Sequence, residues 1–381
     1  MKIMYIDPMS YNNLALYDYS LLSNIDCEIY FVGNKLYDIE MINNVPFFPL
    51  FCYSQKKSIF KAISYIASLF KIVRLTHKVN PDIIHIQWIR LWFVDYLFLK
   101  YLRCKKYKVV YTAHNALPHV QKKNDFKHYK KYYKLVDSII THSQNTKKEL
   151  VSCFDVDEAK INVIPHGILD LSTSANEQNV NSIKTEFVEK YNLKNKIVFS
   201  SLGLQDFYKG SDLIYDVWLN NFANNKDVFL IIAGSLSDRL REYNTKEFEK
   251  LDNTYVNFAR IDNDLFLALL QSTDVLLLPY RKISQSGILL SAINEKIPFL
   301  VSEVGGLSES LSIGNVGWNI KKATYENLLK QLENILKNKN DLRLKKNNTE
   351  WNKLNDYYSW RAIGIKTKQL YAKLLKTYCA K

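Results

Sequence analysis

The chain has 381 residues, 47% of them hydrophobic, which is long enough for two domains with sizeable cores. Its net charge of +14 at pH 7 indicates anionic partners, which include nucleic acid, an anionic membrane and acidic ligands. Asp7 and Pro8 interrupt the start of the chain and no stretch of about 20 residues lacks charge, so neither a signal peptide nor a membrane-spanning helix is expected.

In the first half of the chain, apolar strands alternate with helical segments. A helix is expected at Leu14–Leu22, after the first strand, and another from Gln144. The expected strands are Lys2–Asp7, Cys27–Val32, Asp82–Trp88, Val109–Ala113, Ser138–Ser143 and Ile161–Ile164. This alternation predicts a doubly wound α/β domain.

The segment Ser54–Lys78 has apolar residues at helical spacing and six basic residues, but no acidic one. Its apolar stripe consists of Ile59, Ile63, Ile66, Phe70 and Val73. Such a pattern is typical of a helix that lies on a membrane surface, although a helix packed on the core with a solvated basic face has the same composition. Between Leu97 and Leu135 the only acidic residue is Asp125, so basic charge is concentrated in the first half.

Leu169–Asn181 is polar and rich in Ser and Asn, which indicates a linker between domains. A second α/β run follows, and its end, Leu329–Asn348, predicts a solvated helical surface rich in lysine and asparagine. The expected strands of this run are Ile197–Gly203, Val228–Ala233, Val256–Arg260, Val275–Leu278 and Pro298–Val301, and the chain ends in a helix from Ser359 to Leu375.

The stretch Leu278–Glu309 has the order strand, polar loop, Ser286-Gly287 and helix. The first amides of a helix have no intrahelical partners, and a glycine lets the backbone approach an anion closely. Ser286 can cap the helix and offer a hydroxyl. The pattern therefore predicts a phosphate-binding loop, although an ordinary capped turn between a strand and a helix has the same short pattern.

This stretch resembles the donor-binding segment of glycosyltransferase family 4, because Ala292, Pro298 and the sequence GGLSE match the end of the family's pattern. The two glutamates of that pattern are replaced by Ile283 and Ser291. The stretches TAHNALPH and IPHGI, the Gly203 to Gly210 segment and the tail that begins with Ser359-Trp360 occur in the family's order.

The resemblance implies the GT-B architecture, which is α/β with two doubly wound, Rossmann-like domains facing across a cleft. The first domain, 1–170, would lie on the acceptor side, and the second, 171–354, would bind the nucleotide sugar. Residues 355–381 would form a helix that returns to the first domain. The implied activity is metal-independent transfer of a sugar from a nucleotide-diphosphate donor to a glycan or lipid-linked acceptor, with retention, in surface polysaccharide biosynthesis.

The resemblance also assigns roles to particular residues. His114 and Lys209 would be catalytic, His114 by contacting the donor sugar and Lys209 by neutralising the diphosphate. The arginine that usually precedes such a lysine is replaced by Leu204, and Arg281 or Lys282 could supply its contact. The residues expected to bind the donor are Gly203, Lys209, Arg260, Ile261, Gln285, Ser286, Gly287, Ile288 and Ser291.

No cofactor or metal is expected, and we interpret the pairs Asp155/Asp157 and Asp262/Asp264 as solvated acids. The expected partners are the nucleotide sugar, the glycan or lipid-linked acceptor and an anionic membrane surface, without nucleic acid. The five cysteines have no metal-binding spacing, which is typical of a cytosolic protein, so we expect a peripheral protein on the inner face of the cell membrane. Two alternatives remain, a nucleotide-sugar epimerase of the same fold and a non-enzymatic nucleic-acid-binding protein.

Overall fold

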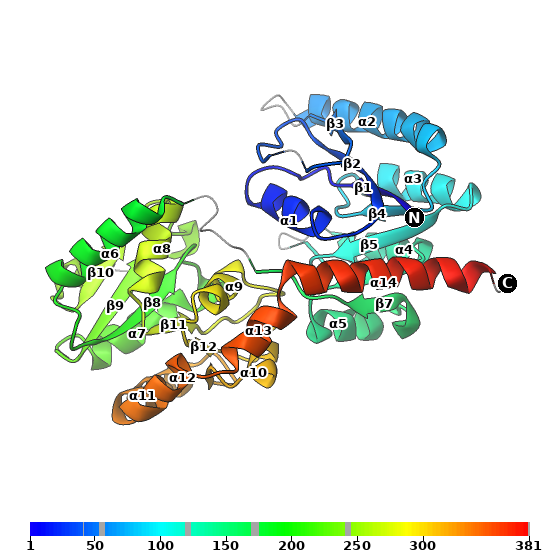
Figure 1. Cartoon of the computed structure of the whole chain (residues 1–381). Coiled ribbons are helices and arrows are strands. Elements are labelled where there is room, and N and C mark those ends of the chain that lie inside the picture. The colour runs from blue at the N-terminus through cyan, green and yellow to red at the C-terminus, as the bar shows by residue number, and fades with distance from the viewer. Residues whose placement is uncertain (41, 53–57, 119–122, 169–174, 241–244, 380–381) are drawn as a thin grey trace. The chain divides into compact units, whose positions relative to one another are not determined.

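The computed structural model describes residues 1–40, 42–52, 58–118, 123–168, 175–240 and 245–379 (Figure 1). The chain forms two compact units. Unit 1 consists of residues 1–167 and 358–381, and unit 2 of residues 168–357. The boundaries expected at 170 and 354 lie three residues from these. None of the helices in the described ranges is long and apolar enough to cross a membrane.

Unit 1 is built on a seven-stranded parallel sheet with the order β3-β2-β1-β4-β5-β6-β7. The central strands are apolar on both faces, as expected for a parallel sheet covered by helices. The strands are β1 (Lys2–Ile6), β2 (Glu28–Asn34), β3 (Phe47–Phe51), β4 (Ile83–Ile86), β5 (Lys108–Ala113), β6 (Ser138–Thr141) and β7 (Ile161–Val163). The expectation missed β3, an edge strand that contains Pro49.

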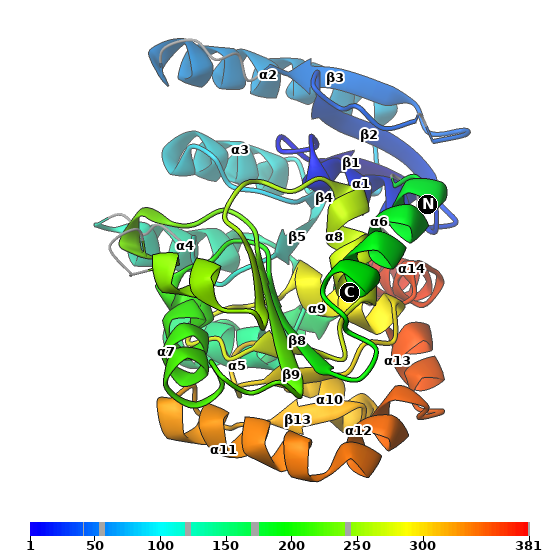
Figure 2. The same cartoon turned by 90° about the vertical axis from the view of Figure 1, so that its left-hand side faces the viewer.

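Helices cover both faces of this sheet (Figures 1 and 2). One face packs against α2 (Ser58–Val79), α3 (Trp92–Cys104), α4 (Asp125–Leu135) and α5 (Gln144–Phe154). The other face packs against α1 (Asn13–Leu22) and the C-terminal helix α14 (Trp360–Cys379), which contact each other. The C-terminal helix is therefore part of unit 1.

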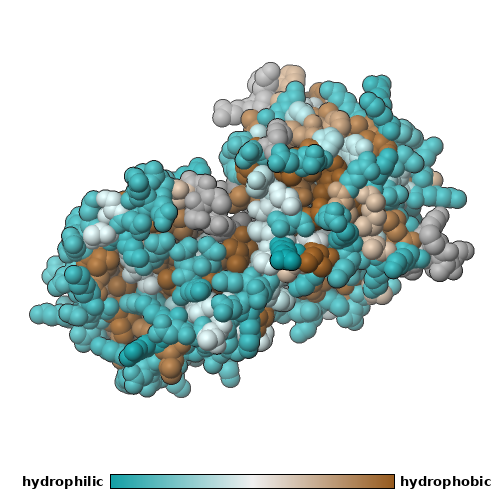
Figure 3. All heavy atoms as spheres, viewed as in Figure 1, coloured by the Kyte–Doolittle hydropathy of each residue, from teal (hydrophilic) through white to brown (hydrophobic). Residues whose placement is uncertain are grey.

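Helix α2 packs on the core through a different face from its apolar stripe. Tyr65, Leu69, Ile72 and Val79 are buried. Three residues of the stripe are exposed instead, with 64% of Ile59, 58% of Ile63 and 68% of Phe70 accessible. The other two, Ile66 and Val73, are half-buried, and Val73 packs against the core. The neighbouring helix α3 exposes Trp92, Phe93 and Leu97. Figure 3 shows hydrophobic side chains among hydrophilic ones on the surface of unit 1.

Unit 2 is built on a six-stranded parallel sheet with the order β10-β9-β8-β11-β12-β13. The strands are β8 (Ile197–Leu202), β9 (Val228–Ala233), β10 (Thr254–Asn257), β11 (Val275–Leu278), β12 (Phe299–Val301) and β13 (Gly317–Asn319). The helices are α6 (Glu177–Lys190), α7 (Ser211–Asn221), α8 (Asn263–Gln271), α9 (Gly287–Asn294), α10 (Glu309–Ile313), α11 (Tyr325–Lys337), α12 (Lys339–Lys346) and α13 (Trp351–Tyr357). Trp218 and Phe229 are among its largest fully buried side chains.

One sequence expectation in unit 2 is wrong, and another holds only in part. The linker expected over Leu169–Asn181 already contains the start of α6 at Glu177, because the side chain of Asn176 caps this helix by accepting hydrogen bonds from Gln178 N and Asn179 N. Its residues 169–174 lie outside the described residues.

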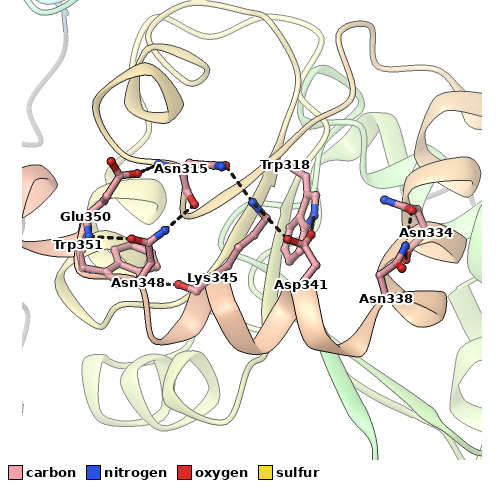
Figure 4. Close-up of polar contacts among 9 residues, drawn as sticks. All are labelled: Asn315, Trp318, Asn334, Asn338, Asp341, Lys345, Asn348, Glu350 and Trp351. Atoms are coloured by element: carbon pink, nitrogen blue, oxygen red, sulfur yellow. Dashed lines mark hydrogen bonds and ion pairs between the residues drawn. The ribbon is translucent and has the colours of Figure 1, made fainter.

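The helical surface expected over Leu329–Asn348 consists of two helices, α11 and α12, which meet at Asn338. It is not wholly solvated (Figure 4). The amine of Lys345 is buried and donates a hydrogen bond of 2.9 Å to Asn315 Oδ1, while Trp318 Nε1 donates one of 2.8 Å to Asp341 Oδ2. These contacts attach α12 to the segment that leads into β13, so Lys345 is a structural residue.

Candidate functional site

The candidate site of unit 2 lies at the carboxyl edge of its sheet, at the point where the strand order reverses. From β8 the chain proceeds to β9 and β10 on one side, and then returns to β11 on the other side of β8. Ligands of open α/β sheets bind in the crevice at such a switch point. The segments that follow β8 and β11 contain most of the residues expected to bind the donor.

Gly203, Lys209 and Ile288 come together at this point. A side-chain Cβ at Gly203 would lie 2.5 Å from Ile288 Cδ1 and 3.8 Å from Lys209 Nζ. Gly203 also has φ +83°, in the left-handed region that favours glycine. Glycine is therefore required here both by the backbone conformation and by the close approach of α9.

Lys209 ends a single turn of 3₁₀-helix, Phe207–Lys209, which Asp206 caps at its start by accepting from Tyr208 N. Gly210 follows in the left-handed conformation. The Lys209 amine lies 5.4 Å from the centre of the Tyr280 ring, and burial lowers the pKa of the amine. Within the described part of the chain Lys209 forms no ion pair, so its charge is available to an anion.

Helix α9 begins beside this amine. The hydroxyl of Ser286 caps the helix by accepting a hydrogen bond of 3.3 Å from Leu289 N, and it is also bonded to the phenol of Tyr280. The first residues of the helix are Gly287 and Ile288. Their backbone N–H groups have no acceptor within the helix, because no helical turn precedes them. Gly305 and Gly306 support the preceding loop, because Gly305 lies against Ile283 O and Gly306 N donates to Ser284 O.

Arg281 is not the substitute phosphate ligand that the sequence suggested. Its Nη1 and Nη2 donate to the two carboxylate oxygens of Asp212 at 2.6 and 2.7 Å, and Nη1 also donates to Phe207 O at 2.6 Å. The guanidinium face lies 4.0 Å from the centre of the Phe207 ring. The end of the fork that would hold a phosphate is thus occupied by a carboxylate, while Lys282 is exposed.

The remaining expected donor ligands are less closely grouped. Arg260 is exposed and Ile261 half-buried, and both follow β10, two strands from β8. Gln285 is half-buried in the loop before α9. Ser291 is buried one turn into α9 and its hydroxyl donates to Gly287 O at 3.2 Å, so it can offer a ribose only acceptor capacity. The nucleoside contacts of these residues stay predictions.

In unit 1, four polar residues directly follow four adjacent strands at the carboxyl edge of the sheet. Asp7, Gln87, His114 and His142 come after β1, β4, β5 and β6. His114 is stacked on Trp88 with ring centres 4.4 Å apart, and its two nitrogens lie 2.9 Å from Gln87 Oε1 and 3.1 Å from His142 Nε2. Of this group, the sequence singled out only His114 as catalytic.

The hydrogen bonds of His142 fix the protons of His114. His142 Nδ1 lies 2.9 Å from Ile164 O, so it carries the hydrogen, and burial lowers the pKa of His142 to about 3, so the ring is neutral. Its Nε2 therefore accepts from His114 Nδ1. Burial also lowers the pKa of His114, whose Nε2 lies 2.9 Å from Gln87 Oε1.

Both ring nitrogens of His114 therefore have a protein partner in this structure. The catalytic contact of His114 with the donor sugar stays a prediction. A further buried group continues the network, because His85 Nδ1 is 2.6 Å from the hydroxyl of Tyr371 in α14. The contacts that surround His114 come from strands and a helix far apart in sequence.

Asp7 and Asp18 form a second buried polar pair, beside Tyr5 at the end of β1. Burial raises the pKa of Asp7 to about 7 and also raises that of Asp18. Asp7 Oδ1 accepts from Met9 N at 2.5 Å, and Asp18 Oδ1 accepts from Tyr5 OH at 2.6 Å. The pair orders the loop after β1, and no sequence pattern indicated it because Asp18 lies within a helix.

Within the described residues, no three His, Cys, Asp or Glu side chains are grouped to hold a metal ion. Asp155 pairs with Lys130 at 3.0 Å, and Asp157 and Asp262 each cap a helical turn. Asp264 accepts from Asn176 N at 2.9 Å. These acids have local structural roles, and metal independence stays a prediction. His119 lies outside the described residues.

Two family models match this sequence. Glycosyltransferase Family 4 matches residues 32–169, and Glycosyl transferases group 1 matches residues 183–351. An uncharacterized 41.2 kDa protein in the cps region of Klebsiella pneumoniae is 30% identical over 285 residues, which cover 70% of this chain and 74% of that protein.

Solved structures of similar fold cover the whole chain. Sucrose-phosphate synthase from Thermosynechococcus elongatus has a TM-score of 0.72 at 16% identity, with 99% of this chain and 100% of that chain covered. Anabaena HepE in complex with UDP-glucose has a TM-score of 0.68 at 14% identity, with coverage of 99% and 100%. The two parallel-sheet units and these matches give one conclusion: the chain belongs to glycosyltransferase family 4 and is a glycosyltransferase with the GT-B fold.

Proposed function

We propose that this glycosyltransferase transfers a sugar from a nucleoside-diphosphate donor, with retention and without a metal ion. The observation that carries the proposal is the position of Lys209. Its amine has no ion-pair partner among the described residues and lies beside Gly203, near the first turn of α9. A half-buried cation, unpaired helix amides and a glycine-lined approach together suit a diphosphate.

The chemistry would be electrostatic. When the bond between the anomeric carbon and the diphosphate oxygen breaks, negative charge develops on the leaving group, and the Lys209 amine and the α9 amides would stabilise it. Stabilisation by these groups makes a divalent cation unnecessary in this proposal. Retention is supported by the family resemblance. In the sequence, no side chain is identified as a nucleophile that would form a covalent intermediate.

The proposed pathway is surface polysaccharide assembly, with a glycan or lipid-linked acceptor. The Klebsiella relative, described as lying in a cps region, supports this pathway. The HepE structures, described as complexes with UDP and UDP-glucose, support a nucleotide sugar as donor. The sugar and the base of the donor are left to experiment.

A screen of nucleotide sugars tests this function. The purified chain is mixed with each donor, first alone in a thermal-shift assay and then with lipid extract as acceptor, and released nucleoside diphosphate is measured. Stabilisation by one donor class together with sugar transfer supports the proposal. Conversion of the donor to its epimer without release of diphosphate would favour the epimerase alternative, and stabilisation only by single-stranded DNA would favour the nucleic-acid binder.

The second part of the proposal is that the enzyme works in the cytoplasm on the inner face of the cell membrane, which it binds through α2 and α3. The supporting observation is the exposed apolar surface of these helices, formed by Ile59, Phe60, Ile63, Phe70, Trp92, Phe93 and Leu97. The two helices are neighbours, because His77 Nε2 lies 2.5 Å from Tyr101 OH. Apolar side chains can enter the acyl boundary of a bilayer while nearby cations contact anionic headgroups.

The charge of this surface favours an anionic lipid as its partner. Its exposed basic residues are Lys61, Lys71, Arg74, Lys78, Lys100, Arg103, Lys105 and Lys106. The one acid within α2 and α3 is Asp95, which is buried and accepts from Tyr65 OH at 2.6 Å. Lys56 and Lys57 lie outside the described residues. Each basic residue near an anionic leaflet contributes about 1 kcal/mol, which salt reduces.

Liposome flotation separates the apolar and charged contributions. We compare the wild type with I63S/F70S, with K61E/K71E and with the control K330E/K339E, whose lysines are exposed on unit 2. The proposal expects binding that rises with anionic lipid, is weakened by both α2 variants and is unchanged in the control. Equal flotation of all four proteins, or no binding at low salt, would contradict it.

A further inference from the structure

The loop that follows β11 forms an ion pair with α7, and neither residue of this pair is among the residues expected to bind the donor. Arg281, in this loop, and Asp212, in the first turn of α7, form two parallel hydrogen bonds of 2.6 and 2.7 Å. The Asp212 side chain is 9% exposed and that of Arg281 27%. A pair this well ordered restrains both of the segments that it joins.

Arg281 also holds the residues that directly precede Lys209. Its Nη1 donates to Phe207 O at 2.6 Å, its guanidinium covers the Phe207 ring, and its backbone N donates to Tyr208 O at 2.7 Å. Phe207 and Tyr208 are the first two residues of the 3₁₀ turn that ends in Lys209. Three separate contacts of Arg281 therefore converge on one three-residue turn.

The turn has little support of its own. Within it, Lys209 N donates to Asp206 O and Gly210 N to Phe207 O, both at 3.0 Å. A single 3₁₀ turn with so few bonds is not stable in isolation, since short helical segments depend on tertiary contacts. Gly210 adds one such contact, because its Cα lies against Pro279 O, immediately before the Arg281 loop.

We propose that Arg281 is a positioning residue for catalysis, which holds the Phe207–Lys209 turn through Asp212 so that the Lys209 amine stays beside Gly203 and Tyr280. This inference rests on the proposed function of Lys209 as the group that binds the donor diphosphate. Arg281 acts through Lys209, because the end of its guanidinium fork is occupied by Asp212 and Phe207 O. Lysine cannot replace it, since an ammonium group lacks the planar fork that binds both partners at once.

A double-mutant cycle tests this role. Steady-state kinetics are measured for the wild type, R281K, K209A and R281K/K209A with the donor found in the screen. We expect R281K to lower kcat about tenfold in the wild-type background and to have no further effect in the K209A background. If Arg281 contacted the phosphate directly, the two losses would multiply instead, and that result would overturn the proposal, as would a wild-type kcat for R281K.

A control separates positioning from general loss of stability. Lys345 is a buried cation of unit 2 that lies away from the candidate site. It donates to Asn315, which precedes β13 at the amino edge of the sheet (Figure 4). We expect K345M to lower the melting temperature without changing kcat of the folded protein at a temperature well below its transition. Equal losses of kcat in K345M and R281K would overturn the proposed positioning.

A readout without any substrate separates this inference from the proposed function. The pH dependence of acetylation at Lys209 and at the exposed Lys330 is measured by mass spectrometry in the wild type and in R281K. Release of the turn should expose the Lys209 amine, so its titration midpoint should be higher in R281K than in the wild type, while the acetylation of Lys330 should be the same in both proteins. An unchanged midpoint overturns the positioning role even when transfer is found, and a raised midpoint supports it even when no donor is accepted.

Discussion

His114 Nδ1 lies 3.1 Å from His142 Nε2, and the two rings share one hydrogen in a buried chain that ends on Ile164 O. Because the carbonyl can only accept, donation runs from His114 to His142 and from His142 to Ile164 O. The Nδ1 hydrogen of His114 is thus committed to its neighbour. The same contact makes the pH response of unit 1 predictable.

We predict that His142 makes unit 1 sensitive to acid. Its pKa is about 3 in the fold, against about 6.5 in an unfolded chain, so below pH 6.5 the unfolded state binds a proton that the folded state does not. The stability it contributes is therefore present above pH 6.5 and is lost as the pH falls toward 3, by up to about 1.4 kcal/mol per pH unit.

The measurement compares urea unfolding of the wild type and H142Q from pH 7.5 to 4.5. The comparison is needed because Asp7, with a pKa raised to about 7, titrates in the same range with the opposite sign. Tyr17, His114 and His166 also face His142. We expect the variant to lose less stability than the wild type as the pH falls. Parallel curves would contradict a neutral His142.

A side chain at Gly203 should damage both the fold and the site. G203A places a methyl group in the left-handed region, which costs about 1–2 kcal/mol, and brings it 2.5 Å from Ile288 Cδ1. We expect a lower melting temperature and weaker binding of nucleoside diphosphate, with partial recovery in G203A/I288A. G314A is the control, because Gly314 has φ −149° and its nearest neighbour would be 3.1 Å away. No recovery in the double variant would mean that Ile288 is not the obstacle.

The transferase should stay active in excess chelator. The acids that resemble metal motifs in the sequence are used as caps and ion pairs, as in Asp262, which accepts from Leu265 N at 2.8 Å. Sugar transfer is measured after dialysis against EDTA and again after addition of Mn²⁺ or Mg²⁺. Activity that disappears with the chelator and returns with either ion would contradict the proposed mechanism.

Sequence patterns within a few residues predicted the buried strands and the capped start of α9. β9 and β11 are buried on both faces and are continuous apolar runs. The loop before α9 was predicted because Ser286 caps the helix and Gly287 opens it. β3 was missed, since Pro49 and a sheet edge weaken its pattern, and the start of α6 was taken for a linker because the capping Asn176 sits among polar residues.

The contacts that decide the site could not be predicted in this way, because they join residues far apart in the chain. Asp212 and Arg281 are separated by 69 positions, and nothing in either neighbourhood indicates the other. His85 and Tyr371 are separated by 286 positions. The sequence offered Arg281 as a phosphate ligand from its charge alone, and only its bond to the buried Asp212 reveals the different role.

The most direct test of the proposed function is the effect of removing the Lys209 amine. We expect K209A to fold with a melting temperature near that of the wild type and to lose a charge-assisted bond of about 1.5–3 kcal/mol to the leaving group. This corresponds to a fall in kcat/KM of roughly 10- to 100-fold. K330A, which removes an exposed lysine of α11, should keep wild-type kinetics. A folded K209A with wild-type kcat/KM would contradict the assignment of Lys209 to the donor site.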